Sequence, residues 1–301
     1  MSKLKIGITK NIHNGHLGSK ERDPNPDMIE NGGLYPLLDR LDCEVVETYQ
    51  AELTEEEEQA YGARYRMGLA SNHTADHVAS LIKRDIFPLG LLSNCNQLMG
   101  MLAGHQRAKS RFSPLRVGLI WMDAHGDFNT PETSLSGMSG GMPVAVSTGL
   151  CLHHIRRAAG LEPPLPMSYV TMVGLRDIDP AEQYLIDKHR LAQISVDDMR
   201  DQTPKITGEI DRLAALTDLI YVHIDLDVIT SEEMPGHGTP APDGPTADEL
   251  ANTIEAMFKH NPKVTGLGLA SYPGANDVDD IGLKSTLKQV EGAVKGIKAR
   301  K

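Results

Sequence analysis

The chain has 301 residues, of which 40% are hydrophobic, enough for one large α/β domain or two ordinary ones. Its 41 acidic and 30 basic residues give a net charge of −11, which argues against nucleic acid or an anionic membrane as a partner. No apolar run approaches the roughly 20 residues that span a bilayer, the N-terminus has no signal-peptide core, and 3 cysteines without framework spacing predict a reduced, cytoplasmic protein.

Eight apolar runs of strand length alternate with helical patterns along the chain. We expect strands at 4–9, 43–48, 87–92, 116–122, 168–173, 192–195, 219–224 and 264–270. We expect helices at 26–41, 55–84, 96–109, 180–189, 205–216, 246–259 and 278–298. Thr246, followed three residues later by Glu249, is a capping-box pattern that supports one of these starts. The alternation predicts an α/β fold with a mainly parallel sheet and helices on both faces.

Three long polar segments carry most of the Gly, Pro and Asn, namely 10–26, 126–142 and 228–246. We expect them to form loops over the mouth of a site. Since no linker divides the chain, we expect residues 1–301 to form a single domain.

Two short runs place acidic residues at every second position. The first carries Asp123, His125 and Asp127, and the second carries Asp225 and Asp227. In an extended backbone, side chains two residues apart point to the same face. Four carboxylates aimed at one point would repel one another unless cations lay between them. The runs therefore predict a ligand set for hard or borderline divalent metals, with enough ligands for two ions.

Both acidic runs come directly after expected strands, 116–122 and 219–224. In parallel α/β sheets, sites form at the carboxyl ends of strands. The predicted topology and the predicted chemistry therefore agree on the place of the site.

The ordered motifs resemble those of the ureohydrolase superfamily, which includes arginase, agmatinase and formiminoglutamase. Residues 123–127 match its D-A-H-x-D motif, 223–228 its second D-x-D motif, 235–240 the loop that follows, and 173–180 a strand end near the substrate. The resemblance implies a three-layer αβα sandwich with a mainly parallel, roughly eight-stranded sheet. It also implies two Mn²⁺ ions bridged by hydroxide, a small-molecule substrate, and assembly as homo-trimers or hexamers.

The resemblance also implies a set of metal ligands: Asp123, His125, Asp127, Asp225 and Asp227. The sixth family ligand is a His, and Cys95 stands at its place in this sequence. A thiolate is softer than an imidazole and must lose a proton to bind. We therefore expect Cys95 to be a ligand, and two Mn²⁺ ions, with Ni²⁺, Co²⁺, Fe²⁺ or Zn²⁺ as alternatives. The other interpretation makes Cys95 a small buried residue at a strand end.

Two departures concern the reaction. Gly140 replaces a His that shuttles protons in arginases, and Ala270 or Ser271 falls where arginases have a Glu that pairs with the guanidinium. A buried guanidinium without a carboxylate would be costly. We expect a C–N hydrolase in which metal-bound hydroxide attacks a guanidino, N-hydroxyguanidino or amidino compound. The departures favour a less basic substrate.

In arginase, a set of polar residues binds the α-carboxylate and α-amino groups of the substrate. Asn129, Ser136 and Asp179 match the positions of these residues. The resemblance therefore implies an amino-acid-like substrate bound by these three residues. The alternative makes Asn129 a turn residue, Ser136 a loop residue, and Asp179 the N-cap of a helix that begins with Pro180.

Proton transfer needs another carrier, because Gly140 has no side chain. We expect Asp127, or a water on the metals, to accept and return protons. His237 is a second candidate, since it lies in the Gly-rich loop near the metals and histidine titrates near neutral pH. The alternative is a solvent-exposed loop histidine. His223 is expected to support a ligand more than to be one, and Asp243 is a distant second choice as a substrate carboxylate.

Two other functions stay open. The chain could be an inactive ureohydrolase-like subunit that pairs with an active partner, as the changes at Cys95, Gly140 and Ala270 suggest. Against this, an inactive site has no reason to keep so costly a cluster of charges. The chain could also be a metal-stabilised binding protein for an amino-acid-like ligand.

Overall fold

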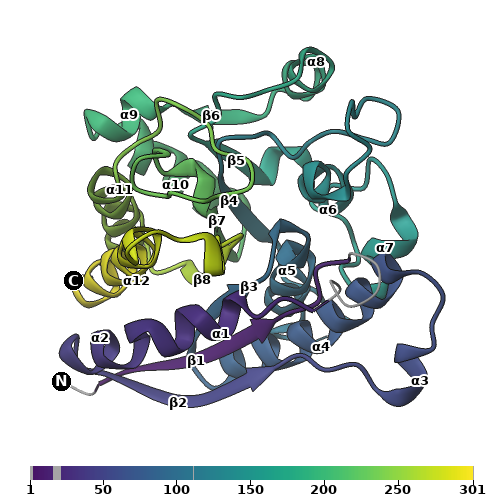
Figure 1. The fold of residues 1–301 in the computed structure, drawn as a ribbon, viewed down its shortest axis with the longest axis horizontal. Coiled ribbons are helices and arrows are strands. Elements are labelled where there is room, and N and C mark those ends of the chain that lie inside the picture. Colours follow the sequence, from purple (N-terminus) through teal and green to yellow (C-terminus); the bar gives the residue numbers. More distant parts are fainter. Residues whose placement is uncertain (1–2, 16–21, 111, 301) are drawn as a thin grey trace.

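The computed structural model of the protein describes residues 3–15, 22–110 and 112–300. Its strands are β1 (Leu4–Asn11), β2 (Cys43–Gln50), β3 (Phe87–Leu92), β4 (Val117–Met122), β5 (Val170–Val173), β6 (Ala192–Ile194), β7 (Leu219–Asp225) and β8 (Val264–Ala270). Within the described residues they form one eight-stranded sheet in the order β2-β1-β3-β8-β7-β4-β5-β6 (Figure 1). Every strand pair is parallel. Every expected strand is present, with ends that differ by at most two residues.

Helices cover both faces of the sheet. They are α1 (Asn25–Ile29), α2 (Tyr35–Arg40), α3 (Glu55–Glu58), α4 (Ala63–Lys83), α5 (Leu98–Arg107), α6 (Pro143–Ser147), α7 (His153–Ala158), α8 (Pro180–His189), α9 (Val196–Arg200), α10 (Lys205–Leu216), α11 (Ala247–His260) and α12 (Ile281–Lys298). A π-helical stretch, η2 (Glu30–Leu34), joins α1 to α2. Short 3-10 turns are η3 (Cys95–Gln97), η4 (Ser139–Gly141), η5 (Met167–Tyr169), η6 (Leu226–Val228) and η7 (Gly274–Asn276).

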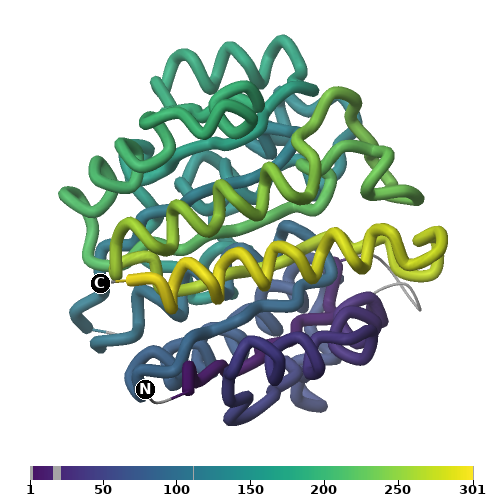
Figure 2. Tube along the Cα trace, turned by 90° about the vertical axis from the view of Figure 1, so that its left-hand side faces the viewer, coloured from purple at the N-terminus to yellow at the C-terminus, as the bar shows by residue number. Residues whose placement is uncertain are grey.

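Two apolar clusters, one on each face of the sheet, hold the three layers together. Ile120 and Met122 of β4 belong to the cluster with α1, α2 and α9 to α12, whereas their neighbours Leu119 and Trp121 belong to the cluster with α4 to α8. Alternate residues of a strand point to opposite faces, so a strand that is buried on both sides is apolar throughout. Figure 2 looks onto the first of these layers, where α11 and α12 lie side by side. The three-layer αβα prediction is confirmed.

Several helix predictions need correction. The expected helix 55–84 is two helices, α3 and α4, because Gly62 has a φ of +95° that no helix accommodates. The expected helix 26–41 is interrupted by η2, where Gly33 has a φ of +121°. The short helices α6 and α9 are absent from the predicted elements, since each has only five residues and too short an apolar pattern.

The strand order brings distant residues together at one edge of the sheet. Cys95 follows β3, Ser271 follows β8, Asp225 ends β7 and Asp123 follows β4, and these four strands are consecutive neighbours. The loops at this edge include the predicted segments 126–142 and 228–246, while residues 16–21 of segment 10–26 lie outside the described residues. Among the helices of the described part of the chain, none combines the length and apolar composition needed to cross a bilayer.

Candidate metal centre

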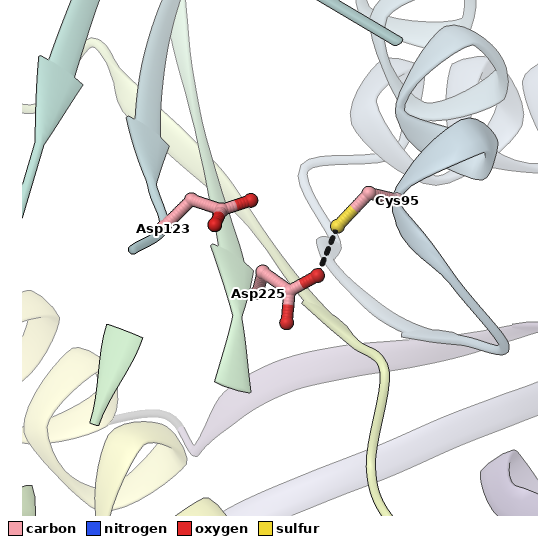
Figure 3. A group of neighbouring side chains, drawn as sticks. All are labelled: Cys95, Asp123 and Asp225. Atoms are coloured by element: carbon pink, nitrogen blue, oxygen red, sulfur yellow. Dashed lines mark hydrogen bonds between the residues drawn. The ribbon is translucent and has the colours of Figure 1, made fainter. Parts of the chain in front are cut away.

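Cys95, Asp123 and Asp225 point toward one another at the carboxyl edge of the sheet (Figure 3). Each is at least 90% buried, and the Cys95 Sγ donates to Asp225 Oδ2 at 2.7 Å. A local turn places the cysteine: the Asn94 side chain accepts from the main chain of η3, and the Gln97 side chain reaches back to the Asn94 N–H. This capping box holds Cys95 against the acidic residues.

The described part of the chain contains three groups of potential ligands. Within each group, the ligand atoms lie within 4.8 Å of one another. Any two groups share one carboxylate, so they form a single connected cluster. The groups are Cys95 with Asp123 and Asp225, Asp123 with His125 and Asp227, and Asp225 with Asp227 and His237.

The acidic runs converge through turns and not through extended strands. Asp227 lies in η6, and its main-chain N–H donates to Asp225 Oδ1 at 3.2 Å. Likewise, the N–H of His125 donates to Asp123 Oδ1 at 2.7 Å. Asp123 converges with His125, and Asp225 with Asp227, as predicted. The predicted extended backbone is wrong, because the first carboxylate of each run accepts the N–H two residues on and so forms a turn.

His125 lies between two carboxylates. Its Nδ1 is 3.3 Å from Asp123 Oδ1 and 3.1 Å from Asp227 Oδ2. Burial alone would lower the pKa of His125, but the hydrogen bonds and charges of Asp123 and Asp227 outweigh it and raise the pKa to about 12. The imidazolium in turn helps to hold the pKa of Asp227 at about 2, against the effect of burial.

The other carboxylates have too little positive charge around them. Burial, reinforced by neighbouring carboxylates, raises the pKa of Asp123 and of Asp127 well above the usual range. Cations that enter the cluster would favour the ionised form of these two groups. Oxygen ligands with one or two imidazoles suit hard and borderline divalent ions, and a thiolate suits softer ones. The residues present therefore fit a centre for divalent cations.

Asp127 is buried and lines the same cavity as the cluster, although it belongs to none of the three close groups formed by the described residues. Its backbone has a φ of +46°, a left-handed conformation that turns the chain from β4 toward α6. The Asp127 carbonyl accepts the N–H of Val144 at 3.0 Å, which fixes this turn on α6. The roles of Asp127 as ligand and proton carrier stay predictions.

His237 lies inside the cluster. Only 6% of its side-chain surface is exposed, so the alternative of a solvent-exposed loop histidine is wrong. Its Nε2 is 3.5 Å from Asp225 Oδ1, and its Nδ1 is 3.8 Å from Asp227 Oδ2. Thr239, two residues on, donates from Oγ1 to Asp227 Oδ2 at 2.9 Å and ties the loop to the centre. Burial by itself would lower the pKa of His237. The hydrogen bond and charge of Asp225 and the charge of Asp227 outweigh burial, so the pKa of His237 is raised.

The three predicted substrate-binding residues line one cavity of about 510 Å³ together with the centre. The Asn129 amide donates to Asp179 Oδ2 at 3.3 Å. Asp179 is the N-cap residue of α8, but its side chain makes no capping hydrogen bond, so it stays directed to Asn129. Ser136 lies at the exposed rim, where its Oγ accepts the N–H of Met138 at 3.2 Å.

The structure also shows where the residues lie that replace the proton-shuttling His and the guanidinium-binding Glu of arginases. Gly140 lines the cavity, with open space around it. Ala270 is fully buried in an apolar cluster, whereas Ser271, at a φ of +65°, donates from Oγ to Asp225 Oδ2 at 2.8 Å. Asp243 is not among the described residues that line the cavity, so a substrate role for it finds no support.

Among the residues that line the cavity but were not predicted from the sequence are Arg64, Asp177 and Thr239. The motif around His237 contains Thr239 and could have indicated it. Asp177 lies 3.6 Å from His125 Nε2. Arg64, at the start of α4, is distant in sequence from every motif, and its guanidinium contacts the Gly137 carbonyl at 3.5 Å. No sequence pattern connects it to the site.

The fold and the site together define a class: an αβα protein with a carboxylate-rich centre for divalent cations at the carboxyl edge of a parallel sheet. Residues 35–293 match the family model described as "Arginase family". The chain belongs to the arginase family, and the ureohydrolase membership predicted from its motifs is confirmed.

Individual relatives agree with this assignment. The chain is 32% identical over 190 residues to the arginase of Bacillus caldovelox, a match that covers 62% of each protein. It is 32% identical over 193 residues to the arginase of Bacillus subtilis, covering 63% of each. These sequence matches span less than two thirds of the relatives' length. The solved structure of the Bacillus caldovelox arginase, at 25% identity, covers 97% of this chain and 98% of its own, with a TM-score of 0.81.

Proposed function

We propose that the protein is a metal-dependent hydrolase that cleaves a C–N bond in a guanidino, N-hydroxyguanidino or amidino compound with an amino-acid-like end. One observation carries the proposal: a buried cluster of carboxylates, histidines and a thiol opens into a cavity of about 510 Å³. Membership of the arginase family supports this reaction class.

Six residues would hold two divalent cations: Cys95, Asp123, His125, Asp127, Asp225 and Asp227. When bound, the ions would supply a water of lowered pKa as nucleophile and stabilise the charge that develops on the substrate. The four carboxylates favour Mn²⁺ among the candidates, while the sulfur of Cys95 keeps Co²⁺, Ni²⁺, Fe²⁺ and Zn²⁺ as alternatives.

Asp127 and His237 are the residues that we propose to hold and return protons. Both lie on the wall of the cavity. The Asp127 carboxylate is a base that can accept a proton from the water held at the centre and return it. His237 is held against Asp225, so its ring is positioned whether or not it is protonated. Gly140, which replaces the arginase histidine, offers no proton-carrying group.

The reacting end of the substrate is proposed to be less basic than a plain guanidinium. Where arginases pair this cation with a glutamate, the chain has Ala270 and Ser271, and the Ser271 hydroxyl already donates to Asp225. A buried guanidinium without an anionic partner would lose more solvation than it regained. An N-hydroxyguanidino or amidino group avoids that cost when it binds uncharged.

The other end of the substrate is proposed to lie near Asn129, Ser136 and Asp179, with Arg64 next to Ser136, at the Gly137 carbonyl. Among the residues that the structure describes, Arg64 is a cation on the cavity wall with a main-chain carbonyl as its partner and no ion pair. A carboxylate on the substrate would complete its hydrogen bonding.

Arg64→Gln is expected to raise the KM for a carboxylate-bearing substrate by about fivefold, with kcat little changed, since an exposed ion pair contributes about 1 kcal/mol. The decarboxylated analogue of the same substrate should be unaffected. Steady-state kinetics on arginine-type and agmatine-type compounds measure this. Arg157→Gln is the matched control, because Arg157 is 70% exposed and pairs with Glu162 outside the cavity. Equal changes for both substrates would contradict the assignment.

The proposed function is tested by metal analysis of the purified protein beside its Cys95→His variant. Each is assayed for urea and ammonia release from arginine, N-hydroxyarginine and agmatine. Two metals per chain, with release from one compound, would support the hydrolase and name its class. No metal and no release in either variant would favour the inactive subunit, and tight ligand binding without turnover would favour the binding protein.

We further propose that residues 1–301 act as one domain in a cytoplasmic homo-oligomer, a trimer or hexamer. Cys43, Cys95 and Cys151 are free thiols, which supports a reducing compartment. Tyr61 and Phe112 are 99% and 100% exposed, and they offer apolar surface that another subunit could cover. Light scattering on the purified chain measures the assembly.

A further inference from the structure

A buried line of polar groups leads from the interior of the sheet to the metal centre. Tyr221, His223 and Asp225 alternate along β7 and share one face of it. The Tyr221 hydroxyl is 3.0 Å from His223 Nδ1, and His223 Nε2 is 3.4 Å from Cys95 Sγ. The Cys95 Sγ then donates to Asp225 Oδ2 at 2.7 Å. Tyr221 and His223 are fully buried.

The direction of each hydrogen bond follows from counting protons. The Cys95 thiol has one proton, and it lies on the short contact to Asp225. The contact between Cys95 and His223 therefore needs an N–H on His223 Nε2 as donor. A neutral imidazole with its proton on Nε2 accepts at Nδ1, so the Tyr221 hydroxyl must donate there. The chain of donors runs from Tyr221 through His223 to the sulfur.

Neighbouring strands hold this line in place. Trp121 on β4 is in register with His223, and their rings stack at 4.7 Å with an interplanar angle of 7°. Gly268 on β8 lies on the other side of His223 in the sheet. A Cβ at Gly268 would be 1.9 Å from the Tyr221 hydroxyl oxygen, so only glycine leaves room for that hydroxyl. The sheet thus forms a fitted slot for both polar side chains.

We propose that Tyr221 and His223 are positioning residues that fix Cys95 as a sulfur ligand of the metal centre. The inference rests on the proposed function in one respect, namely that Cys95 binds a cation. To hold a cation, Cys95 would lose its S–H proton to solvent, and the electron pair left on the sulfur would bind the cation. The sulfur still accepts the N–H of His223, and no other proton moves. This hydrogen bond orients the sulfur and withdraws charge from it.

The test is a Co²⁺ titration of the metal-free protein, followed by the near-ultraviolet charge-transfer band of a thiolate bound to Co²⁺. His223→Phe keeps the stacked ring and removes the donor. It is expected to weaken Co²⁺ binding by about 10–100-fold and to shift the band to lower energy. Tyr221→Phe removes one hydroxyl and should shift the band the same way by less. Tyr49→Phe is the matched control, since Tyr49 lies on β2, away from the centre, and its ring likewise contacts a histidine, His77 of α4.

The outcomes separate the two hypotheses. A band that is absent from the wild-type protein, as it should be from Cys95→Ser, would overturn Cys95 as a ligand and with it that part of the proposed function. A band that is present in the wild type, and unchanged in both His223→Phe and Tyr221→Phe, would overturn the positioning role. If His223→Phe does not fold, judged by circular dichroism, Tyr221→Phe decides alone.

Discussion

Asp225→Asn should abolish metal binding and activity, yet leave the metal-free protein at least as stable as the wild type. Asp225 belongs to two of the three ligand groups among the described residues, so its loss weakens both proposed metal positions. Loss of a residue that only supports a ligand costs about 10–100-fold in metal affinity or activity, and loss of a ligand should cost more. Without metal, the substitution removes a buried negative charge from among like charges.

Metal content, kcat/KM and the melting temperature with and without a chelator test this prediction. The wild type should melt higher with metal than with chelator, whereas Asp225→Asn should lose most of that difference. Asp211→Asn is the control, since Asp211 is 64% exposed and pairs with His260 away from the site. If Asp225→Asn keeps its metal and its activity, the metal centre is wrongly assigned.

Removing the metal is expected to invert the dependence of stability on pH between about 5 and 8. In the metal-free protein the pKa values of Asp123 and Asp127 are raised, and that of His125 is raised to about 12. A raised pKa means that the folded state binds protons more tightly, so this contribution to stability falls as the pH rises. His125 alone loses about 1.4 kcal/mol per pH unit above about 6.5, or about 2 kcal/mol by pH 8.

The loaded protein should behave in the opposite way. Cations bind the ionised carboxylates and so compete with protons, which makes metal binding and the stability it adds increase with pH. Asp227, whose pKa is about 2, titrates below this window and does not change the sign. Melting curves from pH 5 to 8 should show the chelated protein losing about 3 °C above pH 6.5 through His125 alone, and the loaded protein gaining. A chelated protein that gains stability over this range would refute the arrangement of charges around His125.

The exposed rim and the buried centre of the site differ in what a substitution can reveal. Arg64 is exposed and contacts one main-chain carbonyl, so its replacement should affect substrate binding alone. Asp225 is buried and contacts Cys95, Ser271 and the main chain of Asp227, so its replacement should affect metal binding, and with it turnover and the stability that the metal adds. Experiments at the rim are therefore the better guide to the substrate.

Much of the fold could be predicted from local patterns. The strands were found because each is a short apolar run, and a strand buried on both faces needs apolar residues at every position, as in β4. The break at Gly62 was missed, since a lone glycine is also tolerated within helices and its φ of +95° depends on how the loop before α4 packs. The convergence within each acidic run was local as well, because each depends on a turn of two residues.

The sequence alone determined the αβα class and the acidic runs, because residues two to four apart interact whatever the rest of the chain does. Only the tertiary structure decided how distant segments meet. The order of β3, β8, β7 and β4 brings Cys95, Ser271, Asp225 and Asp123 to one edge, and the loop after β7 buries His237 against Asp225. The physical reason is that strand order and loop packing depend on burial over the whole sheet. A short pattern along the chain does not carry that information.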